Sequence, residues 1–145
     1  MNPQADLLNG IQRGLAGYVT YLSACLMKQA YSEYLLYEPI LRILTAHGCR
    51  VVCEYPCKGL GGSGPGDKRR IDFKASHDNL DFVIEVKWAK AVRINIQRDC
   101  EKLAWFKATH PGSAAYLCVF GRRKYVEGLN LRSDSLREVG SAVFA

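Results

Sequence analysis

Apolar residues recur at helical spacing in the first third of the chain. Between residues 5 and 30 every third or fourth position is apolar, which predicts an amphipathic helix. Three glycines weaken that pattern, at Gly10, Gly14 and Gly17. A second helix is predicted to begin at Ser32, a residue type common at N-caps, and to end at Gly48. Pro39 is expected to kink this helix or to split it.

The rest of the chain alternates between extended and helical patterns. Runs rich in β-branched and aromatic residues predict strands at 50–55, 70–75, 81–88 and 114–120. The short connection at 76–79 predicts a hairpin, and helical spacing returns over 95–109. A last helix is predicted at 133–139, with Ser133 as its cap. The expected order is α-β-β-β-α-β with accessory helices at both ends, a mixed α/β (α+β) fold.

Composition limits the class of protein without naming a function. The 145 residues fit a single domain, and 48% hydrophobic with 23% charged residues excludes a disordered or collagen-like chain. The net charge of +6 favours an anionic partner, nucleic acid first. The glycine-rich run at 59–66 lacks the Gly-Lys-Ser/Thr ending of a phosphate-binding loop, so it predicts a loop only.

The lack of a recognisable targeting signal and the spacing of the cysteines favour a cytoplasmic protein with reduced thiols. The first residues have no secretory pattern, and the longest uncharged stretch, 14–27, falls short of the ~20 apolar residues that span a membrane. Cys49, Cys53 and Cys57 are four residues apart, without the close pairs usual in zinc sites. We expect these three to share one face of the strand and to be buried, although a metal remains the alternative.

Charged residues alternate with apolar ones on two of the predicted strands. Side chains in a strand point to alternate faces, so Asp72 opposes Ile71 and Phe73, while Glu85 and Lys87 oppose the apolar residues beside them. If the apolar faces pack on the core, two carboxylates and an ammonium converge on the other face. Such oxygen ligands suit Mg²⁺ or Mn²⁺, which can support phosphodiester hydrolysis. The alternative is a solvated charged face with no chemistry.

The order Asp72, twelve residues, then Glu85-Val86-Lys87 resembles the motif of the PD-(D/E)XK nuclease superfamily. Ile71 stands where that motif has proline. The resemblance implies a restriction-endonuclease-like αβββαβ core, with a mixed central sheet flanked by helices and an extra N-terminal helix. It places one nuclease-like domain over 1–145, with a helical extension at 1–30, the core at 31–120 and a C-terminal extension at 121–145.

The resemblance also implies roles for individual residues. Asp72, Glu85 and the backbone carbonyl of Val86 would bind the metal, and Lys87 would assist the nucleophile. Glu33 best matches the glutamate that many members carry on the first core helix, where it would act as a further catalytic and metal-binding residue, with Glu38 as a weaker substitute. Further candidates, for contact with nucleic acid, flank this motif: Lys68, Arg69, Arg70, Lys90, Arg93 and Gln97.

Two functions from different classes are therefore expected. The first is a Mg²⁺- or Mn²⁺-dependent nuclease, with DNA favoured over RNA and endonucleolytic cleavage favoured. The second is a catalytically silent nuclease fold that binds nucleic acid or a protein partner within a larger complex. No membrane partner is expected. The apolar N-terminal helical region could pair with a second copy of the chain or with another protein.

Overall fold

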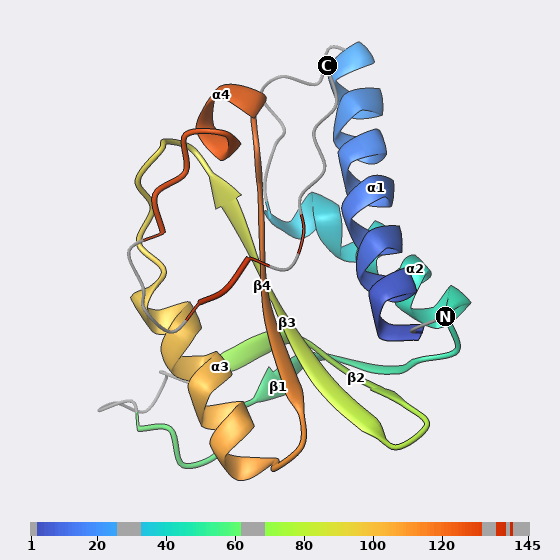
Figure 1. Ribbon diagram of the computed structural model, residues 1–145, viewed down its shortest axis with the longest axis vertical. Helices are drawn as coiled ribbons and strands as arrows, with labels where there is room; N and C mark the ends of the chain where they lie inside the picture. Colours follow the sequence, from blue (N-terminus) through green and yellow to red (C-terminus); the bar gives the residue numbers. More distant parts are fainter. Residues whose placement is uncertain (1–2, 26–32, 62–68, 132–135, 139, 141–145) are drawn as a thin grey trace. The chain divides into compact units, whose positions relative to one another are not determined.

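The computed structural model describes residues 3–25, 33–61, 69–131, 136–138 and 140 (Figure 1). It is a mixed α/β fold whose elements follow in the order α1 (Pro3–Ala24), η1 (Glu33–Leu36), α2 (Tyr37–Ala46), β1 (Arg50–Pro56), β2 (Arg70–His77), β3 (Leu80–Ala89), α3 (Gln97–Thr109), β4 (Ala114–Gly121) and α4 (Arg123–Val126). From α2 to β4 this is the predicted α-β-β-β-α-β order.

The chain divides into two compact units. Unit 1 comprises Met1–His47, Trp88–Ile94 and Gly121–Ala145, and unit 2 comprises Gly48–Lys87 and Asn95–Phe120. Unit 1 therefore holds the helices α1, η1, α2 and α4, whereas unit 2 holds α3 and nearly all of the sheet. The two units are described separately below.

Two helix predictions differ from the structure. Pro39 lies in the first turn of α2, where its missing N–H is tolerated, and the segment before it forms the 3₁₀ turn η1. A C-terminal helix was predicted at 133–139. Of that segment the structure describes residues 136–138, and these have no regular secondary structure, so the prediction is wrong there. The expected caps Ser32 and Ser133 lie outside the described residues.

In unit 1, α1 packs against α2 along one apolar stripe. The buried residues of α1 repeat at three- and four-residue intervals on one face of the helix: Leu7, Ile11, Leu15 and Leu22. A Cβ atom added to Gly14 would lie 2.8 Å from Cδ1 of Ile43, so this glycine allows the close approach of the two helices. Gly10 and Gly14, which weakened the helix prediction, thus lie in the packed surface. The apolar stripe expected to bind a partner is buried inside the molecule.

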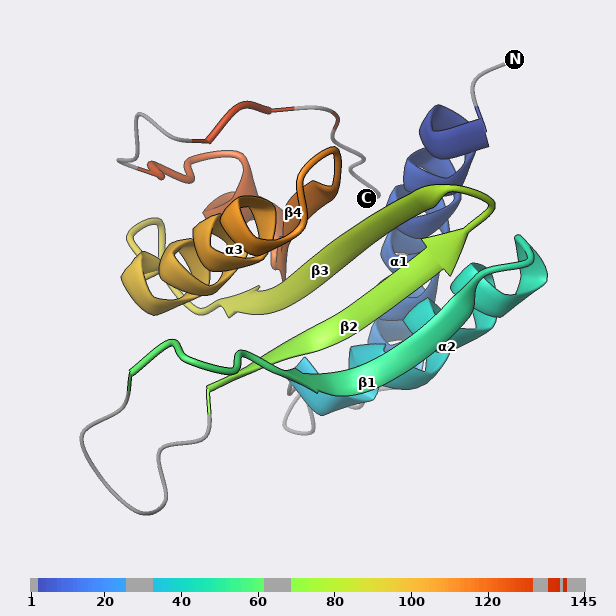
Figure 2. The ribbon, with the colours of Figure 1, turned by 90° about the horizontal axis from the view of Figure 1, so that it is seen from below.

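Unit 2 is built on a four-stranded mixed sheet with the order β1-β2-β3-β4. The first three strands form an antiparallel meander, in which Val52 pairs with Lys74 and Phe73 pairs with Ile84. The strands β3 and β4 run in the same direction, because the chain crosses back through α3 (Figure 1). Figure 2 shows α3 lying over one face of this sheet.

Burial alternates along β2 as the sequence predicted, but it does not alternate along β1. Ile71, Phe73 and Ala75 are buried, and their neighbours on β2 are not. The strand β1 lies at the edge of the sheet, and its register with β2 is the same on both sides of Glu54, which has φ of 53°. The prediction that three cysteines are buried together is wrong for Cys53, which is exposed on this edge strand, whereas Cys49 and Cys57 are buried beyond the two ends of β1.

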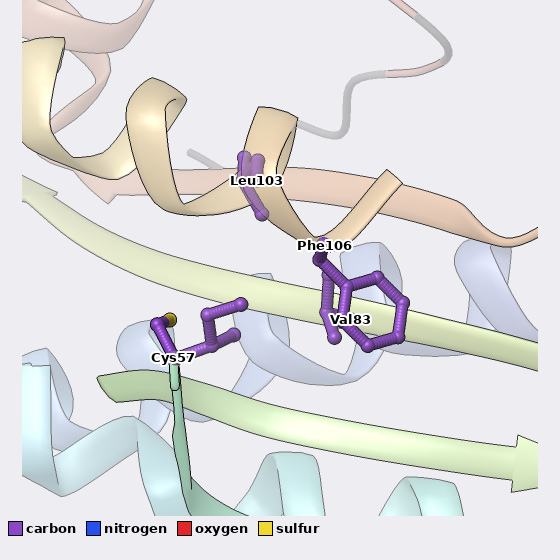
Figure 3. Packing of buried hydrophobic residues seen from close by; sticks show 5 residues of the cluster. Cys57, Val83, Leu103 and Phe106 are labelled. Carbon is purple, nitrogen blue, oxygen red and sulfur yellow. The ribbon is translucent and has the colours of Figure 1, made fainter. Parts of the chain in front are cut away.

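A hydrophobic cluster fixes α3 on the sheet (Figure 3). Leu103 and Phe106 from α3 pack with Val83 of β3 and Ile71 of β2, and Cys57 completes the buried set. Phe106 is fully buried, and the ring of His110 stacks on it with centroids 4.1 Å apart. This packing places the first turns of α3 above the β3 segment that contains Glu85 and Lys87.

Candidate functional site

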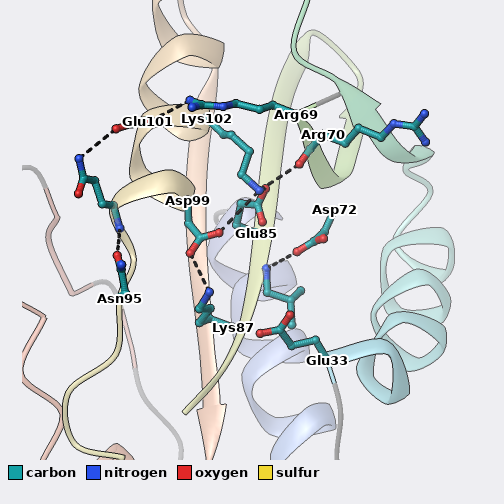
Figure 4. Close-up of polar contacts among 12 residues, drawn as sticks. Glu33, Arg69, Arg70, Asp72, Glu85, Lys87, Asn95, Asp99, Glu101 and Lys102 are labelled. Atoms are coloured by element: carbon teal, nitrogen blue, oxygen red, sulfur yellow. Dashed lines mark hydrogen bonds and ion pairs between the residues drawn. The ribbon is translucent and has the colours of Figure 1, made fainter. Parts of the chain in front are cut away.

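Asp72 ties β2 to β3 through its side chain. The backbone pairing of β2 with β3 runs from His77 and Leu80, next to the turn, to Phe73 and Ile84. Just beyond that point, the amide of Val86 donates a hydrogen bond of 2.7 Å to Oδ2 of Asp72 (Figure 4). A carboxylate thus accepts an N–H at the point where a strand carbonyl would otherwise do so. This bond fixes Asp72 beside the Glu85-Val86-Lys87 segment.

Glu85 is a buried carboxylate, with 2% of its surface exposed. Burial and the nearby charge of Asp72 raise the pKa of Glu85 to about 9, although Lys102 opposes this shift. Two acids therefore lie close enough to compete for one proton. The burial contradicts the alternative in which Glu85 belongs to a solvated charged face.

Lys102 of α3 reaches down to this carboxylate. Its Nζ lies 2.5 Å from Oε1 of Glu85 and donates a hydrogen bond of 3.0 Å to the carbonyl of Arg70. Burial alone would lower the pKa of Lys102, but Glu85 and Asp99 together raise it above its usual value. The ammonium of Lys102 is therefore the nearest described cation to the buried acid.

Asp99, in the first turn of α3, contacts two lysines. Its Oδ2 lies 3.3 Å from Nζ of Lys87, and its Oδ1 lies 3.6 Å from Nζ of Lys102. The ion pairs form a chain of alternating charge, which runs from Lys87 through Asp99 and Lys102 to Glu85 (Figure 4). All four residues belong to unit 2.

Glu33, the predicted helix glutamate, begins η1 in unit 1. Its Oε1 accepts a hydrogen bond of 3.1 Å from the amide of Trp88, the residue that follows Lys87 in the sequence. Glu38, the weaker substitute, is exposed and forms an ion pair with Arg42. A role for Glu33 in metal binding stays a prediction.

The residues proposed for nucleic-acid contact differ in their partners and in the unit to which they belong. Arg69 donates a hydrogen bond of 2.8 Å to Glu101, and Gln97 bonds the same carboxylate at 3.3 Å. Arg70 is exposed in unit 2, whereas Lys90 and Arg93 are exposed in unit 1. Lys68 lies outside the described residues.

A pocket of about 540 Å³ opens at the start of α3 in unit 2. Its lining contains five cationic side chains and one acidic one, with Arg69, Arg70, Lys87, Asn95, Arg98, Asp99 and Lys102. A positively charged lining favours an anionic ligand, and a phosphate group is the anion that arginine and lysine bind most often in nucleic acids. The motif residue Lys87 lies in this lining.

The donor set fits a metal that is held by few protein ligands. Among the described residues, no cluster of three or more His, Cys, Asp or Glu side chains could hold a metal. Mg²⁺ is usually bound through only one or two carboxylates and keeps water or substrate oxygens as its other ligands. Burial, and after it the charge of Asp72, raises the pKa of Glu85, and a divalent cation beside Asp72 would offset the second of these effects. Metal binding by Asp72 and Glu85 stays a prediction.

Sequence reasoning missed Asp99 and Lys102 as site residues. They lie on α3, three residues apart, which places both on one helix face. The apolar anchors Leu103 and Phe106 were visible in the helical pattern, and they indicate which face of α3 meets the sheet. The basic residues from Lys87 to Lys107, Lys102 among them, fit either a path for phosphates or a solvated helix face, and the sequence alone does not choose between the two.

Comparison of the chain with models of protein families, with curated proteins and with solved structures found no match. In the part of the chain that the structure describes, no helix is both long enough and apolar enough to cross a membrane. The functional argument therefore depends on the residues and their geometry.

Proposed function

We propose that this protein is a metal-dependent nuclease of the PD-(D/E)XK type that hydrolyses phosphodiester bonds in DNA. The observation that carries the proposal is the pair of carboxylates on adjacent strands, Asp72 and the buried Glu85, with Lys87 on the same strand as Glu85. The order of the secondary-structure elements and the mixed sheet are consistent with such a core.

The chemistry requires groups that handle negative charge at phosphorus. In the hydrolysis, a bond forms between a water oxygen and phosphorus, and the bond from phosphorus to one sugar oxygen breaks. That sugar oxygen takes up a proton, and the water loses one. Mg²⁺ or Mn²⁺, when bound, would supply positive charge at the phosphate and would acidify a bound water.

The residues of this chain have separate tasks in that reaction. Asp72 and Glu85 would hold the cation, and the hydrogen bond from Val86 keeps Asp72 in place. Lys87 would orient the attacking water or stabilise the developing negative charge. The basic lining at the start of α3 would bind the phosphate backbone beside these groups.

One observation favours the silent binding module instead. Each of the buried or half-buried charges in the chain of ion pairs has a partner of opposite sign within unit 2. Such a network is satisfied without a metal, as a structural network would be. A measurement of metal binding therefore distinguishes the nuclease from the silent binding module more directly than features of the sequence can.

The proposal is tested by calorimetry and by cleavage assays on the same preparation. We expect Mn²⁺ and Mg²⁺ to bind and to support cleavage of supercoiled and linear DNA, and we expect EDTA to abolish cleavage. Asp72→Asn, Glu85→Gln and Lys87→Gln should each reduce cleavage at least 100-fold, about 2.7 kcal/mol of transition-state stabilisation.

The matched control is Asp78→Asn. Asp78 is an exposed acid in the hairpin turn, with φ of 52°, a conformation that asparagine adopts readily. It should cleave as the wild-type protein does. Intact DNA and RNA with both metals, together with no heat of metal binding, would leave the silent module as the function.

A further inference from the structure

Asp99 is an acid whose burial needs an explanation. It lies in the first turn of α3, where a negative charge interacts well with the helix dipole. An exposed acid would serve that purpose equally, yet Asp99 is only 8% exposed and makes no side-chain cap to the helix. Burying a carboxylate is costly unless it is paired. The contacts of Asp99 therefore indicate what it does.

Each oxygen of Asp99 faces a different lysine from a different element. Oδ2 lies 3.3 Å from Lys87 of β3, and Oδ1 lies 3.6 Å from Lys102 of α3. Without this carboxylate, two ammonium groups would share a half-buried region with no anion between them. Lysine also has a flexible four-carbon stem, so its ammonium takes a fixed position only when a partner holds it.

The two lysines differ in how many anchors hold them. Lys102 also contacts Glu85 at 2.5 Å and the carbonyl of Arg70 at 3.0 Å. For Lys87, by contrast, Asp99 is the one acidic partner recorded among the residues that the structure describes. Loss of Asp99 should thus release Lys87 and leave Lys102 in place.

We propose that Asp99 is a positioning residue, which fixes the ammonium of Lys87 between β3 and the first turn of α3 and keeps it apart from Lys102. This inference rests on the proposed function, because it acts through the lysine assigned to the nuclease reaction. Asp99 has no contact with the reacting atoms. It acts by restricting where Lys87 points.

The first test compares Asp99→Asn with Glu101→Gln in DNA cleavage. Glu101 is on the same helix, two residues further on, and it pairs with Arg69 and not with Lys87. For Asp99→Asn we expect kcat to fall 10- to 100-fold while KM for DNA stays equal or decreases, because an anion near the substrate is removed. Glu101→Gln should keep its kcat. Asp99→Glu should restore part of the lost kcat.

The second test needs no activity. Lysine side chains are methylated with ¹³C-formaldehyde and sodium cyanoborohydride in EDTA, so that the imine formed at each amine is reduced, and the modification at each lysine is quantified by mass spectrometry. Labelling of Lys87 should rise severalfold in Asp99→Asn, while Lys107, exposed on the same helix, stays unchanged. If Asp99→Asn does not fold, Asp99→Ser provides a neutral residue that is well tolerated near a helix N-terminus.

The outcomes separate the two proposals. Unchanged labelling of Lys87, or equal losses of kcat in Asp99→Asn and Glu101→Gln, would overturn the role of Asp99. A wild-type protein that neither binds metal nor cleaves DNA would overturn the nuclease proposal, and with it the role of Asp99 in catalysis. Increased labelling in that case would show a purely structural anchor, so the positioning role in catalysis would also fail.

Discussion

The Nζ atom of Lys102, on a helix, lies 2.5 Å from Oε1 of Glu85, on a strand, although the two residues are seventeen positions apart in the chain. The carboxylate is buried and the lysine side chain is 14% exposed, so solvent screens the pair only weakly. This contact explains how an acid can be enclosed under α3. It also shows that α3 contributes charge to the candidate site and does more than cover the sheet.

Lys102→Met should destabilise the protein by about 3 kcal/mol at pH 10, where Glu85 is ionised, because the variant leaves a buried carboxylate without its cation. Urea denaturation measures the change. The matched control is Lys107→Met, in which an exposed charge is lost from the same helix and stability should change by less than about 0.5 kcal/mol. Similar losses in the two variants would mean that the Glu85 pair contributes little.

The stability of the metal-free protein should depend on pH through Glu85. Its pKa is raised from 4.5 to about 9 in the folded protein, so the folded state keeps a proton that the unfolded state releases. The stabilising effect is complete below pH 4.5 and is lost as the pH rises towards 9. The slope contributed by one such proton is at most about 1.4 kcal/mol per pH unit.

Thermal or urea unfolding in EDTA between pH 5 and pH 9 measures this dependence. Glu85→Gln should flatten it, whereas Glu101→Gln, which removes a partly exposed acid on α3 that is paired with Arg69, should not. Added Mg²⁺ should stabilise the wild-type protein most at the alkaline end, since a ligand that binds only the folded state raises stability. A wild-type curve that stays flat over this range would contradict the assignment.

Two substitutions of Asp72 should separate its structural task from its chemical one. Asp72→Ala removes the acceptor for the amide of Val86 and should cost about 1–3 kcal/mol, as expected for a partly buried donor left unpaired. Asp72→Asn keeps an oxygen that can accept this bond, so it should retain most of the stability. Both variants should lose Mn²⁺ binding in calorimetry. Tight binding by Asp72→Asn would exclude Asp72 as a ligand.

The contribution of the basic surface can be measured without cleavage. In EDTA, Arg70→Gln should weaken DNA binding and reduce the slope of log K against log salt by about 1, if the side chain contacts one phosphate. Arg123→Gln is the control, because Arg123 is a similarly exposed arginine that is paired with Glu127 in unit 1. Equal effects of the two changes would indicate a general charge effect.

The elements of the fold were predictable because their patterns are local. The alternation in β2 and the apolar run in β3 follow from side-chain direction in a strand, and the structure confirms the buried Ile71 and Phe73. The same reasoning failed for the burial of Cys53, because β1 is an edge strand of the sheet and Cys53 is exposed there. The position of a strand within its sheet depends on the fold and is not visible in the local pattern of apolar residues.

Only the part of the candidate site that lies on the β2–β3 hairpin was predictable from the sequence. Asp72 and Glu85 lie on adjacent strands, so alternation alone indicated that they could meet. The burial of Glu85 was not predictable, because it depends on the placement of α3 over the sheet. Asp99 and Lys102 were missed for the same reason, since a charged helix face is more often solvated.

The hydrogen bond from Val86 to Asp72 has a consequence for folding. A shift of β3 by one residue along β2 would remove this bond, separate the two acids and exchange the side chains on the two faces of β3, both of which are buried. If Asp72 and Glu85 bind a cation, only chains with correctly paired strands would bind it. A metal titration during refolding would then report the fraction of molecules that have reached the native strand pairing, independently of any substrate.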